Sequence, residues 1–319
     1  MSMFNVASCQ AVDAVLTRCA TFLTFKAKPD ASNLAIIRST LGSIRDLTKN
    51  VAIRDLRSNL TCTVGIGSDF WDRLTQAQRP KELHPLPVIK GRIHATVSTP
   101  ADLLFHIRSD RRDLCFELER QVMDRFGNSV QLTDSTVGFR YFDARDLLGF
   151  VDGTANPVGQ ATMRSAFVTS ETDEAAAGGS YVVVQKYLHD LAGWKKLKVE
   201  EQESIIGRTK VENMELDDAA EGKQAAHKTL TSITDDNGNE VDIVRDNMPF
   251  GSPASGEFGT YFIGYSSKLW VIEKMLERMF VGSPPGMHDR ILDYSTPVTG
   301  CTFFAPSADM LDSLADVED

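Results

Sequence analysis

Short apolar stretches rich in β-branched and aromatic residues lead repeatedly into segments whose apolar residues recur at helical spacing. Residues 60–74 (LTCTVGIGSDFWDRL) and 260–276 (TYFIGYSSKLWVIEKML) show this order most clearly. The residues that align at one common offset are Gly65, Ser68 and Trp71 with Gly264, Ser267 and Trp270. The pattern predicts, in each copy, a strand followed by a helix whose N-cap is the serine.

Two further pairs of segments repeat this order. Residues 94–110 and 181–197 are each predicted to form a strand followed by an amphipathic helix. Residues 138–148 resemble residues 300–311, because both read as a strand that enters an Asp-containing turn. The sequence therefore predicts two α+β halves that join near residues 147–160.

Polar stretches rich in Gly, Asp and Ala separate the predicted elements. They are residues 171–180, 215–226 and 234–240. Asn237 and Gly238 form the dipeptide that most favours a tight hairpin, so we expect a turn between LTSIT and VDIVR. None of these acidic stretches has EF-hand spacing, which favours solvated loops over calcium sites.

Composition and charge narrow the classes of function. A chain of 319 residues is long enough for two domains, each with its own core. Hydrophobic content of 42 % and charged content of 24 % are typical of soluble globular proteins, and no apolar run reaches the length of a membrane span. A net charge of -10 argues against nucleic acid as a partner. The first residues lack a basic end followed by an unbroken apolar core, so we expect a cytoplasmic protein.

Cysteine usage agrees with that location. The five cysteines are Cys9, Cys19, Cys62, Cys115 and Cys301. They are odd in number, widely scattered and free of C-x-x-C spacing. Reduced thiols are therefore expected, and neither a disulfide framework nor a zinc site is indicated.

One aspartate is displayed in a sharp turn within residues 147–160 (LLGFVDGTANPVGQ). Gly149 and Gly153 bracket Asp152, and Pro157 follows. An aspartate in such a turn commonly caps a helix or closes an Asx turn. The competing interpretation, a catalytic carboxylate, depends on which other motifs accompany this one.

Five features of the second half together resemble the dye-decolourising peroxidases, in particular their compact bacterial subgroup. They are GFVDGTANP (149–157), IGRTK (206–210), His227, VRDNMPFG (244–251) and YFIGY (261–265). The first matches the G-x-x-D-G motif of that family. The resemblance spans almost all of the second half, and in the first half it rests on the order of strands and helices.

The resemblance implies a fold, a cofactor and a reaction. The fold is α+β, with two ferredoxin-like βαββαβ modules in an arrangement like a dimeric α+β barrel within one chain. The modules are expected at residues 1–148 and 149–319, with one haem b per chain in the second. The implied enzyme is a peroxidase that reduces hydrogen peroxide to water through a ferryl intermediate. An organic donor, dye-like or phenolic, supplies the electrons.

The resemblance also assigns the iron ligand. His227 matches the proximal ligand of the family and would bind the haem iron through a ring nitrogen. A lone histidine is far more often structural or exposed than a ligand, and we keep that interpretation for the other five. These are His84, His94, His106, His189 and His288.

Three residues are assigned by resemblance to the open side of the haem. Asp152 would take a proton from one oxygen of hydrogen peroxide and return it to the oxygen that leaves. Arg245 would stabilise the negative charge that builds as the O–O bond breaks, because a guanidinium does not deprotonate. Asn247 would hold a water or the peroxide through its amide.

The remaining assignments concern the other face and the rim of the haem. Asp289 is expected to accept a hydrogen bond from the second nitrogen of His227, with Asp293 as the alternative. Arg208 is expected to meet a haem propionate, and a surface salt bridge is the competing interpretation. Phe262 would pack against the macrocycle, although a strand phenylalanine is as often part of the core.

The sequence lacks the motifs of several other enzyme classes. The chain has no Gly-rich nucleotide loop, no H-E-x-x-H and no G-x-S-x-G motif, which argues against dehydrogenases, metalloproteases and serine hydrolases. The alternatives to a peroxidase are a non-catalytic haem-handling protein on the same fold and a ferredoxin-like interaction module without a cofactor. The physiological reductant is not indicated by the sequence.

The last residues, SADMLDSLADVED, read as a short helix with an acidic end. They do not resemble the tail containing Gly, Ser and Leu by which some members of the family enter encapsulin shells. We therefore expect a free cytoplasmic enzyme. A homo-oligomer is expected as well, of an order that the sequence does not indicate.

Overall fold

One path of hydrogen-bonded strands runs through both halves of the chain. The computed structural model describes residues 9–317, and its main sheet has the strand order β4-β1-β3-β2-β12-β5-β10-β8. Neighbouring strands on this path pair antiparallel where their register is given. The two halves meet where Gly67 of β2 pairs with Phe303 of β12.

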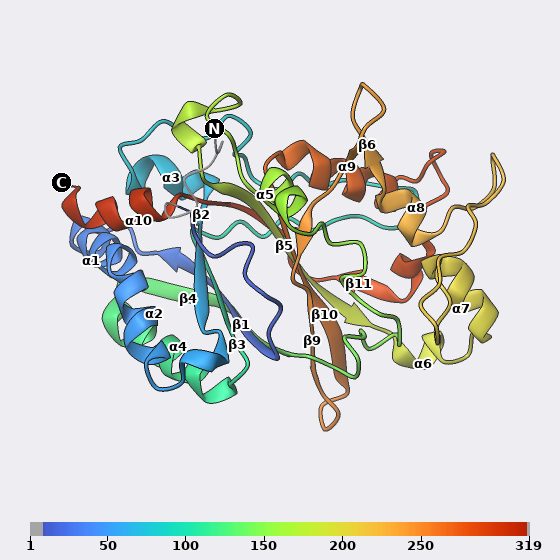
Figure 1. The fold of residues 1–319 in the computed structure, drawn as a ribbon, viewed down its shortest axis with the longest axis horizontal. Helices are drawn as coiled ribbons and strands as arrows, with labels where there is room; N and C mark the ends of the chain where they lie inside the picture. The colour runs from blue at the N-terminus through green and yellow to red at the C-terminus, as the bar shows by residue number, and fades with distance from the viewer. Residues whose placement is uncertain (1–8, 318–319) are drawn as a thin grey trace.

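The first half forms a four-stranded module. Its elements are β1 (Cys19–Ala27), α1 (Ala31–Gly42), α2 (Ile44–Ala52), β2 (Thr61–Gly67), α3 (Ser68–Leu74), β3 (Leu103–Ser109), α4 (Arg112–Phe126) and β4 (Val130–Phe139). Helices α1, α2 and α4 lie together on one side of these strands (Figure 1). The C-terminal helix α10 (Ala308–Ser313) joins this group and contacts α1.

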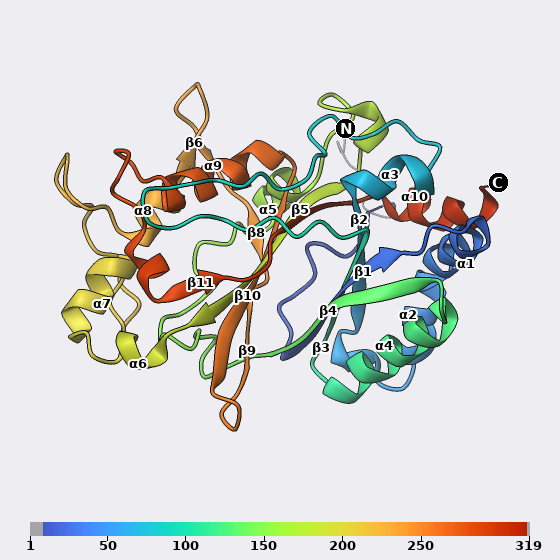
Figure 2. The same ribbon diagram turned by 180° about the vertical axis from the view of Figure 1, so that it is seen from behind.

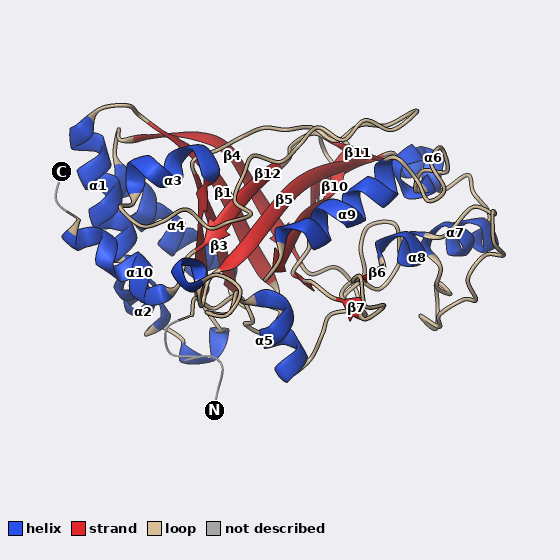
Figure 3. Cartoon of the chain, turned by 90° about the horizontal axis from the view of Figure 1, so that it is seen from above, coloured by secondary structure: helices blue, strands red, loops and turns tan. Residues whose placement is uncertain are grey.

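The second half repeats the plan with a longer first connection. Its strands are β5 (Ser180–His189), β6 (Ile233–Thr234), β7 (Glu240–Val241), β8 (Val244–Arg245), β9 (Met248–Ser252), β10 (Glu257–Ser266), β11 (Ser295–Pro297) and β12 (Cys301–Ala305). Its helices are α5 (Gln160–Ala166), α6 (Leu191–Trp194), α7 (Val199–Ile206), α8 (His227–Thr231), α9 (Leu269–Phe280) and the 3-10 turn η4 (Arg290–Asp293). Helices α6 to α9 lie at the opposite end of the molecule from α1, α2 and α4 (Figure 3).

The strand order confirms the predicted fold class. The strands of the first module are numbered by their order along the chain, and in the sheet they lie side by side as β4-β1-β3-β2. The second module has the same order, β12-β5-β10-β8, when its principal strands are counted along the chain. This shared order is that of a ferredoxin-like βαββαβ unit. Two such units in one chain therefore form the α+β arrangement that the sequence predicts.

Side-chain alternation along the strands divides the core in two. On β1, Ala20 and Phe22 point into a cluster that both modules share, whereas Leu23 and Phe25 point toward the helices. Phe22 stacks on Tyr261 of β10 with ring centroids 4.0 Å apart. The strands of the two modules therefore enclose an interior that is largely apolar but also holds His106 and the buried ion pair of Arg108 with Asp246. The helices cover the outside (Figure 3).

The strand-to-helix predictions hold in part. Residues 60–74 and 260–276 do run from strand to helix, as β2–α3 and β10–α9. Their N-caps are Gly67 and Lys268 and not the predicted serines. They also correspond to the second and third strands of their modules, so the repeat does not align equivalent elements.

The helix predicted at the end of residues 94–110 is wrong. This segment ends in β3, a strand that pairs with both β1 and β2. All seven residues of β3 are buried, and a short apolar run of this kind does not distinguish a buried strand from a buried helix. Tertiary pairing therefore decides the structure of this segment.

The hairpin predicted around Asn237 and Gly238 is confirmed. Ile233 of β6 pairs with Val241 of β7, and Gly238 has a φ of 79°, which favours glycine. The five cysteines are free thiols. Among residues 9–317, no helix has both the length and the apolar character needed to cross a bilayer.

Candidate functional site

A cavity of about 180 Å³, partly open to solvent, lies in the second module. Its walls come from β5, β10, α9, the start of α8, the region around β8 and the turn that precedes α5. The predicted site residues that line it are Asp152, His227, Arg245, Asn247 and Phe262. The fold thus brings these five residues together from segments that are far apart in the sequence.

The imidazole of His227 is held by a buried carboxylate. His227 is the first residue of α8, and its Nδ1 lies 2.6 Å from Oδ2 of Asp289. Asp289 is fully buried and also caps η4, because its Oδ1 accepts from the backbone N–H of Ile291. Since Nδ1 carries the proton of this hydrogen bond, Nε2 is the nitrogen left for a ligand. Burial lowers the pKa of His227, but the charge of Asp289 and its hydrogen bond outweigh burial and leave that pKa above its ordinary value.

Asp152 stands in a turn that two glycines make possible. Gly149 and Gly153 have φ values of 97° and 76°, in the region that side chains other than glycine rarely adopt. The backbone N–H of Asp152 donates to the carbonyl of Ala144, which closes the turn. Its carboxylate accepts from the N–H of the next residue, Gly153, at 2.7 Å, which is a local contact but neither a helix cap nor an Asx turn. The same oxygen also faces Asn247 and lines the cavity.

Arg245 and Asn247 flank Asp152 from the β8 side. The backbone of Arg245 is fixed by Asn156, whose side chain accepts from its N–H at 3.0 Å and donates to its carbonyl at 2.6 Å. Asn247 donates to Asp152 at 3.3 Å and accepts from the N–H of Ile263 on β10. Its amide thus links Asp152 to the sheet. Burial lowers the pKa of Arg245, although the charge of Asp152 opposes that effect.

The rest of the cavity is largely apolar. Phe262 faces the helix side of β10, because its neighbours Tyr261 and Ile263 point into the apolar interior. Helix α9 supplies the opposite wall through Ile272, Met275, Leu276 and Met279. Apolar walls with a few polar groups are typical of small-molecule and cofactor sites.

Arg208 lies beside the main cavity and not in its lining. It borders an adjoining hollow that shares Asp152, His227 and Arg245 with the main one. Its guanidinium donates to Asn213 and forms an ion pair with Glu215 at 3.2 Å. Glu215 is 61 % exposed. The salt bridge that was the competing interpretation is therefore present in this structure.

Asp293, the alternative partner of His227, contacts two other histidines. Its Oδ1 lies 2.9 Å from Nε2 of His94 and 2.8 Å from Nε2 of His288. His227 is bonded to Asp289 instead. Of the two aspartates, Asp289 is the one that the fold places behind the imidazole.

Two residues of the cavity wall were not identified from the sequence as part of the site. Asp146 accepts from the N–H of Phe150, and burial raises the pKa of its carboxyl to about 7. His189, which the sequence predicts to be structural or exposed, bonds to Ser295 and Thr260, and burial lowers its pKa to about 4. Asp146 lies six positions before Asp152 in the same turn, and that proximity was the only available signal.

These side chains offer two different kinds of chemistry within one cavity. His227 presents Nε2 to the cavity while its Nδ1 is hydrogen-bonded to the carboxylate of Asp289. This pattern is typical of histidines that bind transition metals. Asp152 and Arg245 present a proton acceptor and a fixed positive charge.

Comparisons with protein families cover nearly the whole chain. The N-terminal family model described as Dyp-type peroxidase matches residues 10–140, and the C-terminal one matches residues 143–310. A dye-decolorizing peroxidase of Rhodococcus erythropolis is 48 % identical over 301 residues, which are 94 % of this chain and 87 % of that protein. One of Mycobacterium tuberculosis is 48 % identical over 303 residues, covering 95 % and 89 %.

Solved structures agree with the sequence comparisons. DyPB from Rhodococcus jostii RHA1 superposes with a TM-score of 0.92 at 49 % identity, over 96 % of this chain and 98 % of that one. A variant of the same protein in complex with heme gives 0.90 at 48 % identity, over 94 % and 96 %. The encapsulated DyP-type peroxidase from Mycobacterium smegmatis gives 0.91 at 47 % identity, over 96 % and 98 %.

Proposed function

Because this chain belongs to the Dyp-type peroxidase family, we propose that it binds one haem b in the cavity of the second module, with His227 as the iron ligand. The chain is a haem-dependent peroxidase, an oxidoreductase that acts on hydrogen peroxide. The haem-handling alternative is not favoured, since the relatives at 48 % identity are named as peroxidases. The site residues below are assigned by this proposal.

The residues of the cavity fit a haem. Nε2 of His227 is available because Nδ1 is bonded to Asp289. The apolar walls from β10 and α9 suit a macrocycle. Among the described residues, Nε of Arg245 is buried without a hydrogen-bond partner, and a buried donor of this kind is normally satisfied by a ligand or water. When bound, haem supplies an iron centre that exchanges electrons with peroxide and with the donor.

On the proximal side, Asp289 acts through His227. A buried carboxylate that accepts from Nδ1 fixes the tautomer and the ring orientation, and it makes Nε2 a stronger donor to a metal. The distance of 2.6 Å and the complete burial of Asp289 both favour a strong interaction. Asp289 is thus a positioning residue, and His227 is the ligand.

On the distal side, Asp152 moves a proton. Hydrogen peroxide must lose a proton from one oxygen and gain one on the oxygen that departs as water. The carboxylate of Asp152 lines the cavity and is oriented by the N–H of Gly153 and the amide of Asn247. It can accept the first proton and return it to the departing oxygen. Asn247 therefore orients Asp152, in addition to the contact with water or peroxide that the sequence predicted.

Arg245 stabilises the charge that develops on the departing oxygen. Its guanidinium keeps its proton throughout, so it contributes a fixed positive charge in a site of low dielectric constant. Its backbone is tied to Asn156 by two hydrogen bonds, which limits how far the side chain can move. Both the fixed position and the permanent charge of Arg245 suit it to stabilise the departing oxygen.

Arg208 and Phe262 complete the proposed haem site. Phe262 contributes to the apolar wall beside the macrocycle. Arg208 borders the adjoining hollow, and its present partner Glu215 is exposed, so a haem propionate can replace Glu215 at little cost. Arg208 and Phe262 would then act in cofactor binding and not in proton transfer.

The observation that carries this proposal is the imidazole–carboxylate pair of His227 and Asp289 in a cavity that also contains Asp152 and Arg245. Stopped-flow mixing of the haem-loaded enzyme with peroxide tests the roles. We expect Arg245→Leu to slow the first spectral change by about 100- to 1,000-fold. Asp152→Ala should slow it no more than Arg245→Leu does, with a remainder that depends on pH, because water can replace a proton shuttle more easily than a fixed charge.

Two results would reject these assignments. A normal rate in Arg245→Leu would remove the arginine from the reaction. A normal rate in Asp152→Ala at every pH would leave the aspartate as a turn residue only. Arg120→Leu is the matched control, because Arg120 lies exposed on α4 of the first module and should not affect the rate.

We further propose that the modules divide between residues 148 and 149, and that the enzyme is a free, cytoplasmic homo-oligomer. The proposed boundary falls in the segment between the end of β4 at Phe139 and the start of α5 at Gln160. Light scattering after size exclusion measures the oligomeric state, and a monomer would contradict the proposal. Co-purification inside a protein shell, as the name of the Mycobacterium smegmatis neighbour describes for that protein, would contradict a free enzyme.

A further inference from the structure

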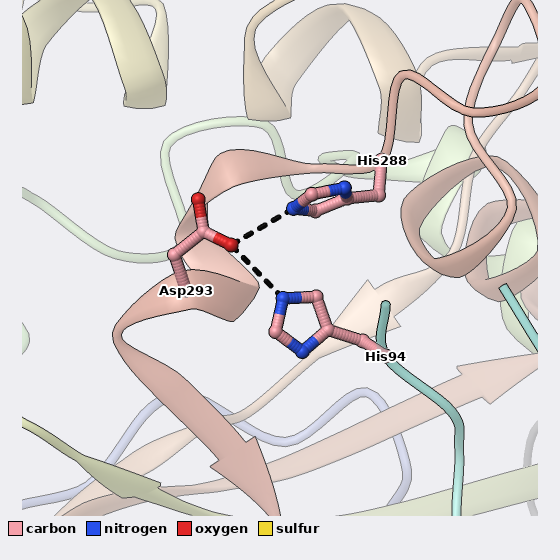
Figure 4. A group of neighbouring side chains, drawn as sticks. All are labelled: His94, His288 and Asp293. Carbon is pink, nitrogen blue, oxygen red and sulfur yellow. Dashed lines mark hydrogen bonds and ion pairs between the residues drawn. The ribbon is translucent and has the colours of Figure 1, made fainter. Parts of the chain in front are cut away.

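Three side chains that commonly bind metals meet outside the cavity. Asp293 lies between His94 and His288, and one of its oxygens accepts hydrogen bonds from both imidazoles (Figure 4). His288 and Asp293 lie just before and at the end of η4. His94 comes from the long connection between α3 and β3, which crosses from the first module to the second (Figure 2). The cluster therefore joins two segments that are almost 200 residues apart.

The geometry of this cluster is close to that of a metal site. Its possible ligand atoms all lie within 4.8 Å of one another. The ring centroids of His94 and His288 are 4.8 Å apart, with an interplanar angle of 70°. Tetrahedral zinc sites with bonds of about 2.0–2.2 Å place their ligand atoms roughly 3.3 Å apart. Small side-chain rotations would open the hydrogen bonds of 2.8 and 2.9 Å to that spacing.

We propose that His94, His288 and Asp293 bind one Zn²⁺ ion, with water as the fourth ligand. Two imidazoles and one carboxylate favour zinc over Mg²⁺, Ca²⁺ or Mn²⁺, which prefer oxygen ligands. The exposed fractions of the side chains are 13 % for His288, 24 % for His94 and 38 % for Asp293. An ion can therefore reach the site from solvent.

The proposed zinc site and the proposed haem site use different residues. His227 bonds to Asp289, whereas the zinc cluster uses Asp293. Zinc would connect the segment of His94 to the segment that carries Asp289, and so link the first module to the proximal side of the second. Binding to the folded chain alone raises its stability by mass action.

Zinc binding by the full-length, haem-loaded protein without an affinity tag tests the proposal. The protein is treated with chelator, dialysed against buffered Zn²⁺ and analysed for zinc per chain. We expect the unaltered protein to bind one Zn²⁺ per chain. His94→Ala should bind zinc at least 10-fold more weakly, since even the loss of an outer-shell partner lowers metal affinity by about 10- to 100-fold. Zn²⁺ should also raise the melting temperature of the unaltered protein and not that of His94→Ala.

Control variants make the result specific. His84→Ala is the matched control, because His84 lies in the same connection, is about half exposed and pairs with Glu273. It should retain the zinc, and Asp293→Asn should weaken binding. An unaltered Soret band will show that His94→Ala is folded and loaded. The proposal is overturned if the unaltered protein and His94→Ala bind the same amount of zinc, which would leave the cluster as a hydrogen-bonded contact between two segments.

Discussion

The two modules share one strand order but use the space beneath their helices differently. In the first module, Phe25, Phe105 and Phe126 meet edge to face between the sheet and α4, with ring centroids 5.5–5.8 Å apart. In the second module, α9 occupies the same place in the chain order as α4, between the third and fourth strands. There the helix and the sheet border the cavity of about 180 Å³, which is partly open to solvent.

The difference lies in the first connection of each module. Helices α1 and α2 connect β1 to β2 and pack on α4. The corresponding connection from β5 to β8 holds α6, α7 and α8, of four, eight and five residues, and the β6–β7 hairpin. Helix α8 begins with His227. The two modules share a topology, and the proposed function depends on the cavity between helix α9 and the sheet of the second module, and on the side chains that line it.

The largest expected effect is on stability, and it compares a phenylalanine in the packed core of the first module with one beside the cavity of the second. Phe105→Ala should lower the free energy of unfolding of the haem-free protein by about 3–5 kcal/mol, because Phe105 is fully buried. Phe262→Ala should cost less than half as much, since Phe262 is only partly buried beside the cavity. It should instead speed the transfer of haem to apomyoglobin. Equal losses of stability in urea unfolding would show that the two modules do not differ in this way.

The next effect concerns the buried carboxylates of the two modules. Asp289→Asn should reduce haem affinity or peroxidase activity by about 10- to 100-fold, because the neutral amide cannot supply the charge behind His227. Asp102→Asn is the matched variant in the first module, where Asp102 accepts from Lys26 and from the N–H of Ala27. It should lower stability and leave haem affinity unchanged. Haem titrations of both variants measure this, and a normal affinity and activity in Asp289→Asn would contradict the proximal assignment.

The smallest expected effect comes from Asp146 in the cavity wall. Its pKa is raised to about 7 by burial, from an ordinary value of 3.8. The stability that it contributes is fully present below about pH 4 and is lost as the pH rises toward 7, by no more than about 1.4 kcal/mol per pH unit. Asp146→Asn should flatten this decline in unfolding experiments on the haem-free protein at pH 5 and pH 8, and an unchanged slope would count against the raised pKa.

Local patterns and motifs predicted much of this molecule. The strand-to-helix order of residues 60–74 and 260–276 and the hairpin at Gly238 depend on neighbouring residues, and the structure has both. The glycines of the first site motif, Gly149 and Gly153, adopt the positive φ values expected of a sharp turn around Asp152.

Other features depend on contacts between distant segments. The pairing of β2 with β12 and the burial of β3 are tertiary, and the apolar run in residues 103–109 does not indicate either. Asp289 and Asp293 are four positions apart, and the resemblance favoured Asp289 as the partner of His227. The fold shows that Asp289 contacts His227 and that Asp293 contacts His94 instead. The raised pKa of Asp146 follows from burial that no local pattern predicts.

The most direct test of the account is the haem spectrum of His227→Gly with and without imidazole. The account predicts that the variant loses most of its haem or changes the spin state of the iron, because the cavity has lost the nitrogen that faces it. Added imidazole should restore a spectrum close to that of the unaltered enzyme. A Soret band that is unchanged in His227→Gly without imidazole would contradict the assignment of His227 as the ligand.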